Sequence, residues 1–312
     1  MMEQNKDRLS IDVAKLYYKS DYSQQQIANK LNLSRPTVSR LLQYAKEKGF
    51  VQINIADPIE DNSSLEKALC EKYNLDVVKI AYAPLNTTNE IKKSISIKAA
   101  DYLHEIAKDG DIIGVCWGTT IYNMALNLKH KALKGVQIVQ LKGGISHSQS
   151  NTYAYEVVEL FSEAFSTVGR YLPLPVMFDT AQIKELIERD KHIKKILDLG
   201  RQANIAVFTV GTVNDALLFR LGYIDKKDRD IIQNRAVGDI CSRFIDAQGN
   251  ICDKELDERT VGIKLEDLKE KEKRVLVAGS KRKISAIKAA LKGEFANILV
   301  TDQYTAEELL KD

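Results

Sequence analysis

One lysine lies where it can react with a ligand, at the end of an apolar run. The run is QIVQL (137–141), and Lys142, Gly143 and Gly144 follow it directly. A lysine amine can pair with an acid, bind a phosphate or hydroxyl group, or condense with an aldehyde to form a Schiff base. The last reaction needs a neutral amine, which burial or a neighbouring cation favours. The two glycines leave room for a ligand beside the amine, and all three roles stay open for Lys142.

A second place with ligand chemistry is the turn Gly118-Thr119-Thr120. It follows the apolar run DIIGVCW (111–117) and precedes a helical pattern. Backbone N–H groups, two hydroxyls and the positive end of a helix dipole can bind an anion there. Glycine and threonine are also ordinary residues at the start of a helix, so the turn alone is compatible with either role.

Two further stretches place charged side chains beside glycine. Gly279 ends an apolar run and is followed by basic residues, among which Lys283 is expected to face an anion; a solvated cationic surface is the alternative. In GDICSRF (238–244), Arg243 is expected to help bind that anion. Asp239 is expected to pair with Arg243 or to accept a hydrogen bond from a sugar hydroxyl. The alternative for this stretch is a surface β-hairpin.

These groups together predict a phosphorylated, hydroxyl-bearing small molecule as the ligand. The sequence contains no HExxH, Walker, GxSxG or GxGxxG motif, so zinc hydrolysis, nucleotide hydrolysis and dinucleotide redox chemistry have no support. The four cysteines show no CxxC spacing and are expected to be reduced. We therefore expect no metal, no cofactor and no catalytic residues. A sugar-phosphate aldolase or isomerase using Lys142 is one alternative, although no acid/base partner is evident nearby. A regulator that responds to another phosphosugar is the other.

An alternation of strands and helices is expected to position these residues. From about residue 65, apolar runs alternate with helical segments, which predicts an α/β domain with a parallel, doubly wound sheet. Such sheets bind ligands beyond the carboxyl ends of their strands, where Lys142 and the Gly118 turn both lie. The expected strands are residues 77–83, 111–117, 136–141, 205–211, 273–279 and 297–302.

The amino-terminal residues predict a helix-turn-helix. A first helix is expected over residues 8–19, then helices over 24–31 and 35–49 that begin after Ser23 and Ser34. A short strand is expected over residues 50–58. Long donors and small hydroxyls on the last helix suit phosphates and base edges. The expected DNA-binding residues are Gln24, Arg35, Pro36, Thr37, Ser39, Arg40 and Gln43.

Charge is distributed unevenly along the 312 residues. Residues 1–56 carry nine Lys/Arg against five Asp/Glu, whereas the net charge of the whole chain is only +3. A basic small module joined to a near-neutral large one predicts a polyanion partner for the small module. We expect residues 1–57 to bind double-stranded DNA and residues 58–312 to bind the ligand. The polar start MMEQNKDRLS and the lack of a long apolar run predict a cytoplasmic protein without a membrane partner.

Several motifs connect the chain with a known family. It contains, in order, DYSQQQIANKLNLSRPTVSRLLQYAKEKG, GVCWGTT, QIVQLKGGISHS, NTYAYE, RYLPLPV, VGDICSRF and VAGSKRK. Over essentially its full length it resembles the sugar-binding transcriptional regulators of the sorbitol-operon (SorC) family, and among them the Gram-positive regulators of deoxyribonucleoside use. The resemblance implies a repressor of deoxyribonucleoside catabolism that leaves its operator when a deoxyribose phosphate, such as deoxyribose 5-phosphate, binds.

The same resemblance implies details of the effector domain. It is similar to sugar-phosphate isomerases and glucosamine-phosphate deaminases, without turnover. The phosphate is expected to meet Gly118, Thr119 and Thr120, with Lys283 and Arg243 as helpers. Relatives carry a GGS-like turn where this chain has Gly279-Ser280-Lys281, so the resemblance does not define the backbone contacts at this turn. A homo-oligomer, either dimer or tetramer, is also implied.

Overall fold

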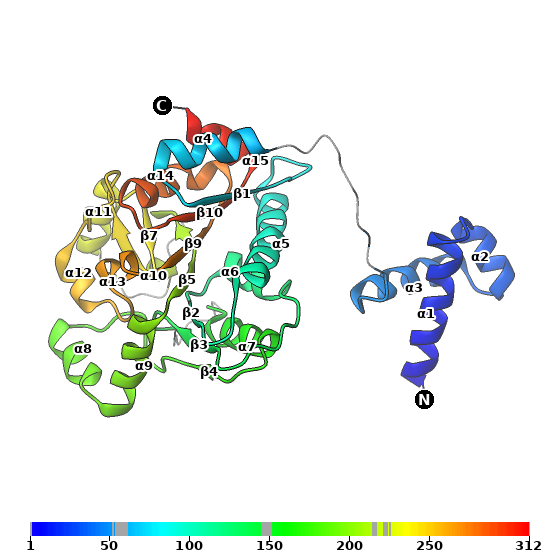
Figure 1. Ribbon diagram of the computed structural model, residues 1–312, viewed down its shortest axis with the longest axis horizontal. Helices are drawn as coiled ribbons and strands as arrows, with labels where there is room; N and C mark the ends of the chain where they lie inside the picture. The colour runs from blue at the N-terminus through cyan, green and yellow to red at the C-terminus, as the bar shows by residue number, and fades with distance from the viewer. Residues whose placement is uncertain are drawn as a thin grey trace. The chain divides into compact units, whose positions relative to one another are not determined.

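The computed structural model describes residues 2–51, 53, 62–144, 152–213, 217–220, 224 and 226–311. The chain divides into two compact units, Met1–Glu60 and Asp61–Asp312 (Figure 1). The expected domain boundary between residues 57 and 58 falls outside the described residues. Each unit is considered by itself below.

The small unit is built from three helices: α1 (Met2–Tyr18), α2 (Gln24–Leu31) and α3 (Arg35–Glu47). Capping explains where α2 begins. The Ser23 hydroxyl accepts from the Gln26 N–H, and the Gln26 side chain accepts from the Ser23 N–H, which is a complete capping box. The Ser34 hydroxyl caps α3 by accepting from the Thr37 N–H. These side chains satisfy backbone donors that the first turn leaves unpaired.

A single apolar cluster holds the three helices together. Its buried members are Val13, Ala14, Ile27, Ala28, Val38, Leu41, Leu42 and Ala45. Helix α1 begins at Met2, earlier than expected, and residues 24–31 form α2 as predicted. Of the strand expected over residues 50–58, the described Phe50, Val51 and Ile53 lie in no strand, and the other residues fall outside the described part.

The large unit is organised around a parallel sheet, which confirms the predicted fold class. In its described residues the strand order is β1-β10-β9-β5-β2-β3-β4, and every pairing is parallel. The strands are β1 (Val77–Ala81), β2 (Ile112–Val115), β3 (Gln137–Gln140), β4 (Gly169–Arg170), β5 (Ile205–Phe208), β9 (Lys273–Val277) and β10 (Ile298–Asp302).

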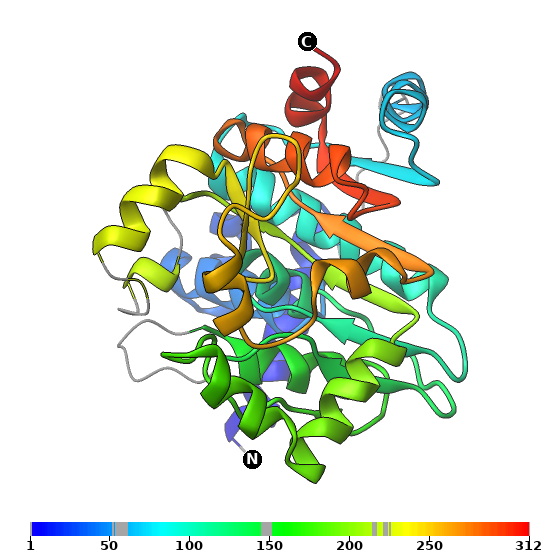
Figure 2. The ribbon, with the colours of Figure 1, turned by 90° about the vertical axis from the view of Figure 1, so that its left-hand side faces the viewer.

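Both faces of this sheet are buried, which is why its strands read as continuous apolar runs. Side chains alternate between two core clusters: Val275 and Val277 of β9 enter one, and Leu276 enters the other. Helices cover both faces (Figures 1 and 2). The helices of the large unit are α4 (Ser63–Tyr73), α5 (Thr88–Ile106), α6 (Thr119–Ala125), α7 (Ala154–Ala164), α8 (Ala181–Glu188), α9 (Lys191–Gln202), α10 (Leu217–Arg220), α11 (Lys226–Arg235), α12 (Lys254–Arg259), α13 (Leu265–Lys269), α14 (Ile284–Lys292) and α15 (Gln303–Leu310).

The expected strand over residues 205–211 is in fact two strands. It breaks at Thr209, and β6 (Val210–Gly211) leaves the parallel sheet to pair antiparallel with β7 (Gly238–Ile240). Strand β8 (Arg243–Ile245) completes this small three-stranded sheet. The break matters because it places Thr209 at the carboxyl end of β5.

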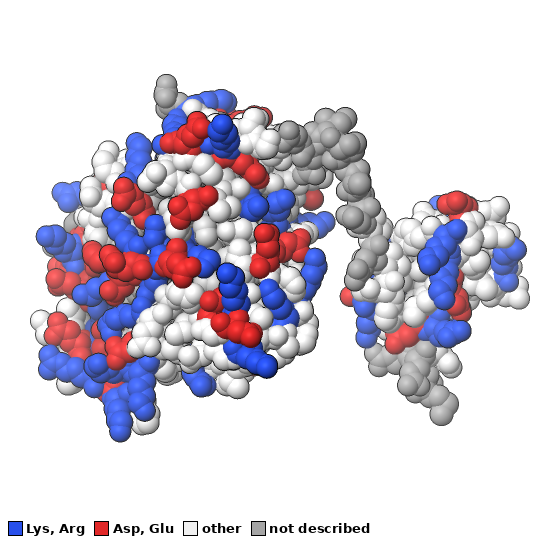
Figure 3. Space-filling view, viewed as in Figure 1, with Lys and Arg blue, Asp and Glu red and all other residues white. Residues whose placement is uncertain are grey.

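Two global features bear on function. No helix in the described ranges is both long and apolar enough to cross a membrane. On the face shown in Figure 3, Lys and Arg side chains of the large unit are interspersed with Asp and Glu rather than gathered by sign. That face therefore offers no broad basic surface to a polyanion.

Candidate functional site

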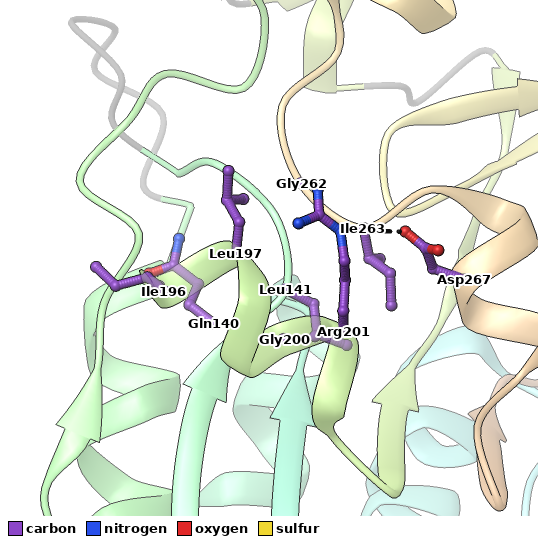
Figure 4. A pocket seen from close by; sticks show the side chains of 9 residues that line it. All are labelled: Gln140, Leu141, Ile196, Leu197, Gly200, Arg201, Gly262, Ile263 and Asp267. Carbon is purple, nitrogen blue, oxygen red and sulfur yellow. Dashed lines mark ion pairs between the residues drawn. The ribbon is translucent and has the colours of Figure 1, made fainter. Parts of the chain in front are cut away.

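A cavity of about 370 Å³ opens at the carboxyl ends of β2, β3, β5 and β9. From β2 the chain continues outward to β3 and β4, whereas β5 lies on the other side of β2. The cavity thus lies at the point where the strand order reverses, the usual ligand site of a doubly wound sheet. A second hollow, between α9 and α13 near Gln140, Arg201 and Asp267, holds only about 10 Å³, scarcely one water (Figure 4).

The first wall of the cavity is the turn after β2. Gly118, Thr119 and Thr120 all line it, as the sequence predicted for a ligand site. Gly118 has φ +142°, a conformation that favours glycine, and it leads directly into α6. The Ser96 hydroxyl donates to the Thr120 carbonyl at 3.2 Å and anchors this turn to α5. The turn therefore presents hydroxyls and the backbone N–H groups of a helix start to the cavity.

The opposite wall comes from the end of β9. Gly279, Ser280, Arg282 and Lys283 line the cavity there, and the Lys283 ammonium donates to the Thr209 hydroxyl at 3.4 Å. Of the two readings left open for this basic stretch, the wall of a cavity agrees better with this position than a solvated surface does. Cations on one side and hydroxyls on the other suit an anionic group of a ligand.

Lys142 forms a third part of the lining and is buried, with 7% of its surface exposed. Its ammonium lies 3.7 Å from the centroid of the Trp117 ring and donates to the Ser242 hydroxyl at 3.4 Å. The first contact is a cation–π interaction. Among the described residues no ion pair of Lys142 with a carboxylate is formed, so a salt-bridge role has no support there.

The β7–β8 hairpin brings an acid to the cavity. Its turn residues Cys241 and Ser242 have φ +50° and +70°, as a tight two-residue hairpin turn requires. Asp239 lines the cavity and accepts from the Ser242 N–H at 3.0 Å. This stretch does form a hairpin, but its residues from Ile240 to Ile245 are buried rather than on the surface, and its turn is part of the site.

Two buried thiols lie at this turn, that of the turn residue Cys241 and that of Cys116, which follows β2. Burial raises the pKa of the Cys116 thiol well above its usual value. A hydrogen bond with Cys116 lowers the pKa of Cys241. Cys116 is therefore neutral and adds no negative charge beside Lys142.

The expected role of Arg243 as a ligand contact is wrong. Arg243 is 2% exposed and does not line the cavity. It forms an ion pair with Asp257 at 2.5 Å and donates to the backbone carbonyls of Asp257, Thr260, Gly262 and Ile263. All of its N–H groups have partners, so none remains for a phosphate.

Gly143 and Gly144 likewise lie outside the cavity lining. A Cβ on Gly143 would lie 2.0 Å from the Pro175 carbonyl oxygen, and one on Gly144 would lie 2.4 Å from the Ala154 Cβ. The expectation that these glycines make room for the ligand is therefore wrong. They make room for other parts of the same chain, at Pro175 and Ala154. The Gly143 carbonyl also accepts from the Trp117 indole at 2.8 Å, which fixes the ring over Lys142.

Comparison with known proteins shows which family this chain belongs to. The family model described as “Putative sugar-binding domain” matches residues 57–311. The sorbitol operon regulator of Klebsiella pneumoniae is 30% identical, with 99% of this chain and 100% of that protein covered. The crystal structure of full-length SorC from the same organism superposes with a TM-score of 0.77 at 28% identity, covering 97% and 98% of the two chains.

The chain belongs to the SorC family of sugar-binding transcriptional regulators. Within the SorC family it is similar to the deoxyribonucleoside regulator of Bacillus subtilis, with 56% identity over 312 residues and full coverage of both chains. This SorC-family chain is therefore a transcriptional regulator, and the cavity lies inside its family's sugar-binding region.

The small unit of this SorC-family regulator presents the predicted DNA-facing residues on α2 and α3. Arg35, Pro36, Ser39, Arg40 and Gln43 are exposed, while Gln24 and Thr37 are half-buried. Val38, Leu41 and Leu42 are buried on the other side, as predicted. The Arg40 guanidinium donates to the Thr37 hydroxyl at 3.4 Å, which holds it along the helix surface.

Some lining residues were missed by sequence reasoning. Trp117 both lines the cavity and is buried, so it belongs to the wall and to the core. Ser242 and Thr209 were missed. Ser242 lies in the hairpin turn rather than in a strand, so alternation of side chains offered no signal for it. Thr209 had no signal either, because the apolar run of residues 205–211 continues through it.

Among the described residues, no group of three or more His, Cys, Asp or Glu side chains is arranged to hold a metal ion.

Proposed function

We propose that this SorC-family regulator is an operator-binding repressor of deoxyribonucleoside catabolism that is released by a phosphosugar, deoxyribose 5-phosphate being the best candidate. One observation carries the proposal: a single cavity combines the Gly118-Thr119-Thr120 turn and Lys283 with Lys142 and Asp239. The turn and Lys283 suit a phosphate, whereas Lys142 and Asp239 suit the carbonyl and hydroxyl groups of a sugar. The 56% identity to a protein named deoxyribonucleoside regulator supports the choice of sugar.

The DNA-binding part of the proposal is that residues 1–57, which lie in the small unit, act as a helix-turn-helix domain. Two capped helices, α2 and α3, are joined by a short turn in which Asn32 has φ +52°. Exposed Arg35 and Arg40 supply the positive charge that a DNA backbone attracts. We propose that α3 enters the major groove and that a two-fold oligomer reads a palindromic operator.

The proposal for residues 58–312, which contain the large unit, is ligand sensing without turnover, on a fold similar to sugar-phosphate isomerases and deaminases. An aldolase or isomerase using Lys142 is the competing function, because a buried lysine in a sugar cavity suits Schiff-base catalysis as well. Incubation with deoxyribose 5-phosphate separates the two: detectable aldehyde or isomer product, formed catalytically, favours the enzyme.

The test of the regulator is operator release by a panel of phosphosugars. Operator-bound protein is titrated with deoxyribose 5-phosphate, ribose 5-phosphate, glucose 6-phosphate and unphosphorylated deoxyribose. We expect deoxyribose 5-phosphate to release the operator at the lowest concentration and deoxyribose to fail, because it lacks the anion that Lys283 and the Gly118 turn would bind. Equal release by all four compounds, or by none, contradicts the proposal.

Lys142 gives a sharper test of how the sugar is held. We propose that its amine condenses with the open-chain aldehyde: nitrogen bonds to C1, and the carbonyl oxygen leaves as water, so a protonated imine forms from the ammonium and the aldehyde. Borohydride delivers hydride to C1 and traps the adduct. We expect the protein mass to rise by one reduced sugar phosphate, and no adduct with Lys142→Met.

Two controls make the adduct specific. Deoxyribitol 5-phosphate, which has no aldehyde, is expected to give no adduct. Lys283→Met keeps Lys142 but removes a cation from the far wall, so the adduct should form at higher sugar concentration. An adduct that persists in Lys142→Met, or no adduct in the unaltered protein, would refute covalent binding while leaving plain phosphosugar binding to be judged by the operator titration.

A further inference from the structure

The buried hydroxyl of Thr305 fixes the backbone of the cavity wall at Ser280. Ser280 lines the cavity with φ +87° and ψ 148°, a strained conformation for a residue that has a Cβ. Its N–H donates to the Thr305 hydroxyl at 2.8 Å. The neighbouring Gly279 is packed so closely that a Cβ there would lie 2.5 Å from a carboxylate oxygen of Asp302. This strained wall persists because groups on α15 hold it.

Thr305 connects that wall to the start of α15. Its hydroxyl donates to one carboxylate oxygen of Asp302 at 2.5 Å, while its N–H donates to the other at 3.0 Å. Asp302 is the N-cap residue of α15, and both side chains are completely buried. The hydroxyl has one proton, given to Asp302, and a lone pair, given to Ser280. Movement of the wall therefore cannot occur without affecting the first turn of α15.

The far end of α15 is bonded to α4. The Tyr73 hydroxyl donates to the Leu309 carbonyl at 2.8 Å, and the Lys72 ammonium donates to the Leu310 carbonyl at 2.9 Å. Leu69 of α4 and Leu309 belong to the same buried cluster. Figures 1 and 2 place α4 and α15 at one end of the large unit, away from α8 and α9. Helix α4 is the first described element of the large unit after the small unit.

We propose that Thr305 is a positioning residue through which ligand occupancy of the cavity is transmitted to α15 and α4, and from there to the segment that carries the DNA-binding helices. This inference rests on the proposed function, since it assigns the regulation of that same site. A ligand that contacts the Ser280 wall changes its backbone, the Thr305 hydroxyl carries the change to α15, and the carbonyls at the end of α15 carry it to α4. Coupling of this kind is a free energy that ligand and operator share equally.

The decisive variant is Thr305→Val, which removes the hydroxyl and keeps the shape. In the unaltered protein, saturating phosphosugar is expected to weaken operator binding by about 5- to 150-fold, the usual range of allosteric coupling. In Thr305→Val we expect this factor to fall towards one, while operator affinity without sugar stays within about threefold. Sugar binding, followed by the fluorescence of Trp117, the chain's single tryptophan, should stay within about tenfold.

The effect of operator DNA on sugar affinity is a second measurement, and it would not change if Thr305 only stabilised the fold. Because coupling is shared, operator DNA should weaken sugar binding in the unaltered protein by the same factor and should cease to do so in Thr305→Val. Thr305→Ser, which restores the hydroxyl, should restore both effects. Tyr73→Phe removes the hydroxyl at the other end of α15 and should also reduce the coupling, so the inference remains testable if Thr305→Val folds poorly.

The chain offers a matched control in Thr301→Val. Thr301 is also completely buried, lies on β10 close to Asp302, and its hydroxyl has no hydrogen-bond partner among the described residues. The same substitution there removes no hydrogen bond and should leave the coupling unchanged. Full coupling in Thr305→Val and Tyr73→Phe, or equal loss in Thr301→Val, overturns the inference. If the unaltered protein shows no sugar-dependent release at all, the proposed function fails first.

Discussion

Replacing Arg243 by methionine is expected to lower the free energy of unfolding of the large unit by about 3–5 kcal/mol, the usual effect of breaking a buried ion pair from one side. The change strips Asp257 of its cation and leaves the carbonyls of Thr260, Gly262 and Ile263 without their donor. Burying unpaired polar groups costs free energy even when the replacement fills the volume. Urea denaturation followed by Trp117 fluorescence measures this directly, because that tryptophan lies in the large unit.

A surface arginine provides the matched control. Arg189 pairs with Glu185 at 3.9 Å, and both side chains are largely exposed, so Arg189→Met should change the free energy of unfolding by less than about 0.5 kcal/mol. If Arg243→Met were as stable as the unaltered protein but bound phosphosugar poorly, Arg243 would be a ligand contact and the structural assignment would be mistaken.

Arg243 also explains how the cavity keeps its shape. Its hydrogen bonds hold the backbone from Asp257 to Ile263, and Gly262 in that stretch forms a backbone bridge with Lys142. Gly262 has φ +122°, and a Cβ there would lie 2.5 Å from the Lys142 Cα. The residue next to Arg243, Ser242, contacts the Lys142 ammonium. Arg243 thus stabilises the segments on two sides of Lys142 without touching the cavity.

Much of the fold could be predicted because its signals are local. Parallel strands buried on both faces appear as apolar runs, and residues 77–83, 273–279 and 297–302 each contain the observed strand. Serine caps fixed the starts of α2 and α3 to the residue. The short strand β4 and the break at Thr209 escaped, because two-residue strands exist only through their partners across the sheet.

The cavity was only partly predictable, for a physical reason. A residue type and its place at a strand end indicate chemistry, which located the Gly118 turn, Lys142 and Lys283. They do not say which way a side chain points. Arg243 faces away from the cavity, and the absence of side chains at Gly143 serves packing against Pro175. Those assignments depend on contacts between segments far apart in the chain.

The second large effect is expected at the DNA-facing helix. Arg35→Ala and Arg40→Ala should each weaken operator binding by about 10- to 100-fold, the range for losing one good contact to a base or a phosphate in a protein–DNA interface. Both side chains are exposed and lie in the first two turns of α3, where a recognition helix meets DNA. A gel shift at fixed, moderate salt measures the affinity, and sugar binding by Trp117 fluorescence should be unchanged.

The salt dependence tells the two kinds of contact apart. If an arginine binds a phosphate, its alanine variant should reduce the slope of log K against log salt by about one and weaken all DNA sequences alike. If it reads a base, the slope should persist and discrimination at one operator position should be lost. Arg8→Ala is the control, because Arg8 lies on α1 and pairs with Asp12. An operator affinity unchanged in both α3 variants would show that α3 is not the recognition helix, since no other described helix of the small unit exposes two arginines within its first two turns.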